Sequence, residues 1–100
     1  MNKNIVSMEE RKLPENGCIF KHSTRCPISS AAAEEVKAYD WKIPVLWINV
    51  IEERPMSDWV AAETGVKHQS PQLLFFSGGQ VVKSLSHSQI RADNFSSGKS

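Results

Sequence analysis

The sequence predicts a single α/β domain in which helices flank a four-stranded mixed sheet, made of two parallel strands and an antiparallel hairpin. A chain of 100 residues with 40% hydrophobic content supports one compact core and leaves no room for a second. Short apolar runs alternate with helical stretches, which is the pattern of an α/β layer rather than of a helix bundle or a sandwich. We place the domain at residues 17–95, between a short N-terminal segment, 1–16, and a disordered tail, 96–100.

The first half of the domain is predicted to fold as strand, helix, strand. Apolar residues within 17–21 follow a proline break and indicate a short buried strand. Pro27 suits the first position of a helix because its missing N–H would have no partner there, and apolar residues follow it at helical spacing. The run 45–51 is apolar on both faces and rich in β-branched residues, as in a strand covered by helices on both sides. Cys26 is therefore expected at the N-cap of the first helix.

The second half is predicted to contain a helix, a hairpin and a last short helix. The first of these helices is expected near residues 57–64, with Gly65 in a position that tolerates a left-handed cap. The apolar runs 72–76 and 81–82 flank Ser77-Gly78-Gly79-Gln80, a composition that favours a tight turn between antiparallel strands. A right-handed crossover through the first helix would place the first two strands side by side and parallel.

Charge and hydropathy exclude several kinds of partner. The formal net charge is +1, and the 12 basic and 11 acidic residues are scattered, which argues against nucleic acid or an anionic membrane surface. The longest apolar run, 45–51, is far below the roughly 18 residues that a membrane span needs. Residues 1–12 lack the apolar core of a signal peptide. We therefore expect a cytoplasmic protein whose cysteines are free thiols.

Cys26 is the candidate nucleophile. Helix N-termini and neighbouring cations lower the pKa of a cysteine thiol from about 8.5 into a range of about 3.5 to 7.5. The predicted N-cap position and the adjacent Arg25 offer Cys26 both influences, and His22 would add to them if it faced the thiol. Ser29 stands where a dithiol oxidoreductase carries its second cysteine. Its hydroxyl can hydrogen-bond a thiolate but cannot close an internal disulfide, so the expected mechanism is monothiol.

The other candidate residues have simpler explanations. Cys18 lies in an apolar strand and is expected to pack in the core, with a role as resolving thiol as the alternative. His22, His68 and His87 could be imagined with Cys26 around a metal, but no pair has the spacing of a zinc site. No metal is therefore expected.

Two stretches of the chain, KHSTRCPIS at 21–29 and TGVKHQSPQ at 64–72, and more loosely residues 79–82 with 86–87, carry a family resemblance. The chain resembles the thioredoxin superfamily and, within it, the YtxJ-like proteins assigned to the bacillithiol system as monothiol, bacilliredoxin-like members. The resemblance implies a three-layer thioredoxin-like fold. It also implies thiol–disulfide exchange on mixed disulfides between proteins and a low-molecular-weight thiol, bacillithiol, which serves as co-substrate without any bound cofactor.

The same resemblance implies which residues form the site. Cys26 would be the nucleophile, with Arg25 and Ser29 beside it. Pro71 would be cis and present the backbone of Ser70 to an incoming disulfide. The other residues implied at the substrate are Thr24, Pro27 and His68. The partners would be bacillithiolated or otherwise oxidised proteins.

Two other functions stay open at this point. The fold could serve as a non-catalytic adaptor in a stress response, with the thiol only a target of modification. It could also serve as a glutaredoxin-type carrier, in which Cys26 and an exogenous thiol hold an iron–sulfur cluster between two subunits.

Overall fold

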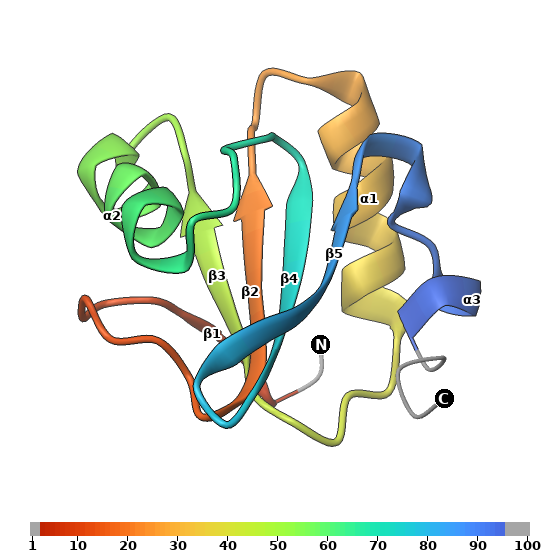
Figure 1. Ribbon diagram of the computed structural model, residues 1–100. Helices are drawn as coiled ribbons and strands as arrows, with labels where there is room; N and C mark the ends of the chain where they lie inside the picture. The colour runs from red at the N-terminus through yellow and green to blue at the C-terminus, as the bar shows by residue number, and fades with distance from the viewer. Residues whose placement is uncertain (1–2, 96–100) are drawn as a thin grey trace.

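The computed structural model describes residues 3–95 and has helices on both faces of a five-stranded sheet. In Figure 1, α1 and α3 lie on one side of the sheet and α2 on the other. The elements in chain order are β1 (Ile5–Ser7), β2 (Asn16–His22), α1 (Pro27–Ala38), β3 (Val45–Asn49), α2 (Arg54–Thr64), β4 (Gln72–Ser77), β5 (Gln80–Ser86), the 3-10 turn η1 (His87–Gln89) and α3 (Ala92–Phe95).

The central strand of the sheet is β2. The strand order is β1-β3-β2-β4-β5, so β2 pairs in parallel with β3 and antiparallel with β4. Strands β4 and β5 form the predicted hairpin, and Gly78 and Gly79 both have positive φ angles, 62° and 79°, in the turn between them. Two successive positive φ angles match the twist of the flanking strands, which explains the glycine pair. The α/β class and the mixed sheet are confirmed.

The sheet has five strands, where the sequence predicted four. The additional strand, β1, pairs in parallel with β3, with Ile5 opposite Val45. A strand of three residues is too short for an alternating pattern to be recognised, and Val6 at its centre is 47% exposed. The segment 1–16 thus contributes an edge strand, while the predicted disordered tail, 96–100, lies outside the described residues.

Alternate side chains of the strands fill two separate cores. Cys18, Phe20 and Val45 face α1 and α3, whereas Ile19 and Ile48 face α2. Buried on both faces, β2 is covered by helices in the way that near-continuous apolar strands require. A polar side chain within this strand is therefore also buried, and Lys21 is such a residue.

Two close contacts restrict which residues fit, one beside α1 and one at the start of β2. The indole N–H of Trp41 donates to the carbonyl of Val36 at 2.8 Å, and its ring packs against Phe75 and Phe95. At the start of β2, a Cβ on Gly17 would lie 2.8 Å from the carbonyl oxygen of the proline before β3, so only glycine fits this close approach.

The ends of α2 differ in how well they were predicted. Its C-terminus is confirmed, because Gly65 adopts the left-handed conformation, with φ 73°. Its N-terminus lies at Arg54, three residues earlier than expected, with a proline in the first turn. Within residues 3–95, no helix combines the length and apolar character needed to cross a membrane.

Candidate functional site

Cys26 is the N-cap residue of α1, as the sequence predicted. Its backbone is extended, with φ −114° and ψ 120°, and its carbonyl accepts the N–H of Ser30 at 3.0 Å. The Cys26 N–H donates to the carbonyl of Ser23 at 3.3 Å, which closes the turn between β2 and α1. Pro27 follows in the first turn, where its missing N–H leaves no donor unsatisfied. The thiol is partly exposed and lies at the positive end of the helix dipole.

Two exposed residues precede the thiol. Thr24 and Arg25 both lie at the surface, and neither ion pair of the described residues involves Arg25. The backbone N–H of Arg25 donates to the Ser23 hydroxyl at 3.4 Å, a long bond that adds little to the stability of the turn.

Ser29 joins this turn to α1. Its side chain is fully buried, and its oxygen accepts the N–H of Ser23 at 2.9 Å and lies 2.8 Å from Nδ1 of His22. The His22 ring also packs edge-on against Trp47, with ring centroids 5.4 Å apart. Burial, and secondarily the charge of Lys37, lowers the pKa of His22, so the ring is neutral at pH 7. Ser29 therefore holds the ends of β2 and α1 together through groups other than the thiol.

The Ser70–Pro71 segment leads into β4 at the same end of the sheet as Cys26. In the antiparallel pairing of β2 with β4, Lys21 lies opposite Gln72. The residues that follow β2 and those that precede β4 therefore lie at the same end of the sheet. The loop before α1 and the loop before β4 share this end of the sheet in Figure 1. The peptide bond between Ser70 and Pro71 is cis, and the Pro71 carbonyl accepts the N–H of His87 at 3.1 Å.

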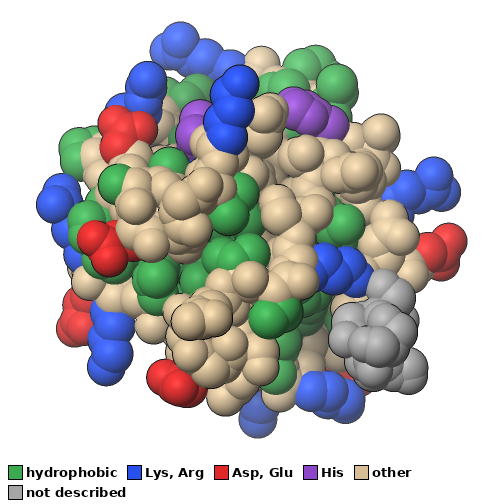
Figure 2. Space-filling model, in the orientation of Figure 1, with side chains coloured by type: hydrophobic (Ala, Val, Ile, Leu, Met, Phe, Trp, Pro, Cys, Tyr) green, Lys and Arg blue, Asp and Glu red, His purple; other side chains and the backbone are tan. Residues whose placement is uncertain are grey.

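His68 lies in the loop before Ser70, and its ring contacts side chains of β2 and α2. Its Nδ1 atom is 3.3 Å from Nζ of Lys21 and 3.1 Å from the hydroxyl oxygen of Ser57. Burial and the nearby Lys21 ammonium lower the pKa of His68. Lys21 itself is fully buried, and burial lowers its pKa to about 8. In the space-filling view, the histidine side chains in sight lie at this end of the molecule, near lysine and arginine side chains (Figure 2).

Lys21 and Ser57 were not predicted as residues of this end of the sheet. Lys21 was expected only as the last residue of a buried strand. The available signal was its position: a lysine directly after three apolar residues of a strand predicted to be buried is itself a candidate for burial. Ser57 carried no comparable signal, because its contact with His68 depends on how α2 packs on the sheet.

Cys18 is buried in the α1 core, as the sequence predicted. It has no exposed surface, and burial raises the pKa of its thiol to about 12, an effect only partly offset by Lys83. A thiol with this pKa remains protonated at neutral pH, so in the folded protein Cys18 is a poor nucleophile. Of the two cysteines, Cys26 is the accessible one.

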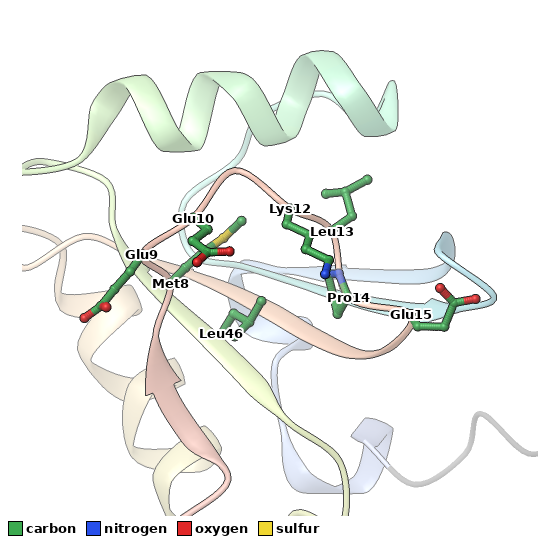
Figure 3. A pocket seen from close by; sticks show the side chains of 8 residues that line it. All are labelled: Met8, Glu9, Glu10, Lys12, Leu13, Pro14, Glu15 and Leu46. Atoms are coloured by element: carbon green, nitrogen blue, oxygen red, sulfur yellow. The ribbon is translucent and has the colours of Figure 1, made fainter.

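Three pockets of the described residues lie away from the thiol. One of them, of about 510 Å³, is lined by the loop between β1 and β2 and by Leu46 of β3 (Figure 3). None of its lining residues belongs to the Cys26 turn or to the loop before β4. In the part of the chain that the structure describes, no group of three histidine, cysteine or acidic side chains is arranged to hold a metal ion.

A partly exposed thiol at the start of the first core helix, beside a proline segment that leads into an antiparallel strand, defines a protein of the thioredoxin fold. Solved structures agree. One, with a thioredoxin fold and provisionally described as an oxidoreductase, matches with a TM-score of 0.79 and 29% identity over 87% of this chain and 80% of its own. A thioredoxin of Malassezia sympodialis matches with a TM-score of 0.57 and 18% identity, over 82% and 76% of the two chains.

A thioredoxin from Aeropyrum pernix also matches, with a TM-score of 0.55 and 18% identity over 78% of this chain and 67% of its own. At such identities the two thioredoxins show the fold alone. The family is defined by the sequence: the chain belongs to the monothiol bacilliredoxin BrxC family, whose model matches residues 2–95. This membership supports a role in thiol redox chemistry.

Proposed function

We propose that this protein is a cytoplasmic monothiol oxidoreductase that removes bacillithiol from mixed disulfides on other proteins, with Cys26 as its nucleophile. One observation carries the proposal: Cys26 is a partly exposed N-cap thiol with a serine, not a cysteine, three residues later, in a chain of the monothiol bacilliredoxin family. Cys18, the other cysteine, is buried in the core and protonated at neutral pH.

The reaction proceeds in two exchanges. In the first, the Cys26 thiolate attacks the bacillithiol sulfur of the mixed disulfide, a new S–S bond forms, and the client protein leaves as a thiolate that takes up a proton. In the second, a further bacillithiol thiolate attacks the bacillithiol sulfur bound to Cys26. The S–S bond between Cys26 and bacillithiol breaks, oxidised bacillithiol leaves and the Cys26 thiolate is regenerated. The attacking bacillithiol is the reductant, so one disulfide is exchanged for another.

The surrounding residues support this chemistry in different ways. Cys26 lies at the N-terminus of α1, at the positive end of the helix dipole, and the exposed Arg25 precedes it in the chain. Ser29, held by His22 and Ser23, stabilises the turn that carries the thiol and prevents an internal disulfide.

Substrate contacts are assigned to the surface on either side of the thiol. The backbone of Ser70, before the cis bond to Pro71, would pair with the incoming disulfide. The remaining contacts are assigned to Thr24, Pro27 and His68.

Mass spectrometry after incubation with oxidised bacillithiol tests the proposal. We expect one bacillithiol adduct, located on Cys26, and its loss when free bacillithiol is added. The matched variants are Cys26→Ser, which should form no adduct, and Cys18→Ser, which should react like the unmodified protein. An adduct only on Cys18, or none on either cysteine, would refute the assignment.

The same two variants separate the alternatives. An adaptor would retain its partners when Cys26 is replaced by serine. A cluster carrier would turn brown on anaerobic reconstitution with iron, sulfide and a small thiol, and would lose that colour in Cys26→Ser.

A further inference from the structure

Lys21 is a buried cation without a carboxylate partner. It lies on the α2 face of the central strand with no exposed surface, and neither ion pair of residues 3–95 involves it. The nearest negative influence is Asp58, an exposed residue of α2 that pairs with Arg54 at 3.5 Å. An unpaired buried ammonium lowers the stability of a fold, and an apolar side chain of similar length would be more favourable there. The fold alone therefore does not explain a lysine at this position.

The contacts of Lys21 determine the protonation of His68. An ammonium group has three donors and no acceptor, so the His68 Nδ1 atom, 3.3 Å from Lys21 Nζ, must accept. The Ser57 hydroxyl, 3.1 Å from the same nitrogen, can donate to it as well. A neutral His68 ring then carries its proton on Nε2. Burial and then Lys21 lower the pKa of His68; Asp58 raises it to a lesser degree, and Arg54 lowers it least, so His68 is neutral at pH 7.

The position of His68 connects this arrangement to the site. His68 precedes Ser70 and Pro71 in the loop that enters β4, at the end of the sheet where the Cys26 turn also lies. Its ring is partly exposed, and the nitrogen that faces Lys21 and Ser57 is the one that is not protonated. The remaining N–H is thus a donor of fixed identity beside the segment expected to receive substrate.

We propose that Lys21 and Ser57 are positioning residues that hold His68 as the Nε2–H tautomer, so that this N–H donates to an oxygen acceptor on the low-molecular-weight thiol of the substrate. The inference rests on the proposed function, since it requires a disulfide bound beside Cys26. It names the substrate class more narrowly: a small thiol that carries carboxylate or carbonyl oxygens near its sulfur. Lys21 and Ser57 act only through His68 and do not touch the substrate.

Two disulfide probes test this proposal. Oxidised bacillithiol carries oxygen acceptors, whereas cystamine carries amines and no oxygen. In Lys21→Met with Ser57→Ala, the second-order rate constant of Cys26 with oxidised bacillithiol should fall about twofold, because only part of His68 remains the Nε2–H tautomer, and it should remain unchanged with cystamine. Lys21→Met alone should cause a smaller fall, because Ser57 still donates to Nδ1. Lys67→Met, which removes an exposed lysine from the same loop, is the matched control for loss of charge and should react like the unmodified protein with both probes.

Nitrogen-15 NMR of the histidine rings supplies a readout that a merely structural role would not change. The unmodified protein should show His68 protonated on Nε2, and the double variant should show a mixture of tautomers. An Nδ1–H tautomer in the unmodified protein, equal losses with both disulfides, or an equal loss in Lys67→Met would overturn the proposal. Failure of the unmodified protein to react with either disulfide would instead refute the proposed function.

Discussion

Replacement of Lys21 by methionine should make the protein more stable at neutral pH. Lys21 is fully buried, and burial lowers its pKa from 10.5 to about 8. At about 1.4 kcal/mol for each tenfold change, keeping Lys21 charged in the folded protein lowers the free energy of unfolding by about 3 kcal/mol. Methionine has a similar length and no charge, but it loses the hydrogen bond to His68, worth about 1 kcal/mol. We expect a net gain of about 2 kcal/mol at pH 7.

The stability gained by Lys21→Met should depend on pH, because Lys21 loses its proton at a lower pH in the folded protein than in the unfolded chain. Below about pH 8 Lys21 is protonated in both the folded and the unfolded chain, so the full cost of the buried charge is present. Between about pH 8 and 10.5 the folded protein releases the proton first, and the cost is progressively relieved. The advantage of Lys21→Met over the unmodified protein should therefore be largest below pH 8 and decrease as the pH rises towards 10.5.

Urea unfolding followed by tryptophan fluorescence, at several pH values from 6 to 10, measures this difference. Lys67→Met is the control, because Lys67 is exposed and its replacement should change the free energy of unfolding by less than about 0.5 kcal/mol. A Lys21→Met protein that is less stable than the unmodified one at pH 7, or a difference that stays constant up to pH 10, would contradict the account of Lys21 as an unpaired buried charge.

Three further predictions follow from the cores and the thiols. Iodoacetamide at pH 8 should label Cys26 and leave Cys18, whose pKa is raised to about 12, unlabelled until urea unfolds the protein; equal labelling of both in the native state would contradict this. Trp41→Phe should lower the free energy of unfolding by about 2 kcal/mol in urea denaturation, because it leaves a buried carbonyl of α1 without its donor, and an unchanged midpoint would argue against that bond. Gly17→Ala should lower it by about 2 kcal/mol in the same assay, because the new Cβ would lie 2.8 Å from a carbonyl oxygen; an alanine tolerated without loss would show that the two strands can separate freely there.

Local sequence rules predicted the position of Cys26 at the start of α1. A proline at the start of an apolar, helically spaced run placed Cys26 at the N-cap, and the structure has it there. The glycine pair 78–79 predicted the hairpin for the same kind of reason. In both cases the backbone preference of one or two residues decides the conformation, so no distant contact is needed. The three-residue strand β1 escaped prediction because its stability comes from β3, about 40 positions later, rather than from its own pattern.

The sequence by itself determined the order of the elements from β2 onward, the N-cap position of Cys26 and the serine three residues after it. Only the tertiary structure decided which polar side chains act together. Lys21 and His68 are 47 positions apart and meet because β2 and β4 pair in one register, while Ser57 reaches the same nitrogen only because α2 packs on that face. Strand register and helix packing are set by the two cores as a whole, and a shift of one residue would turn Lys21 to the other face.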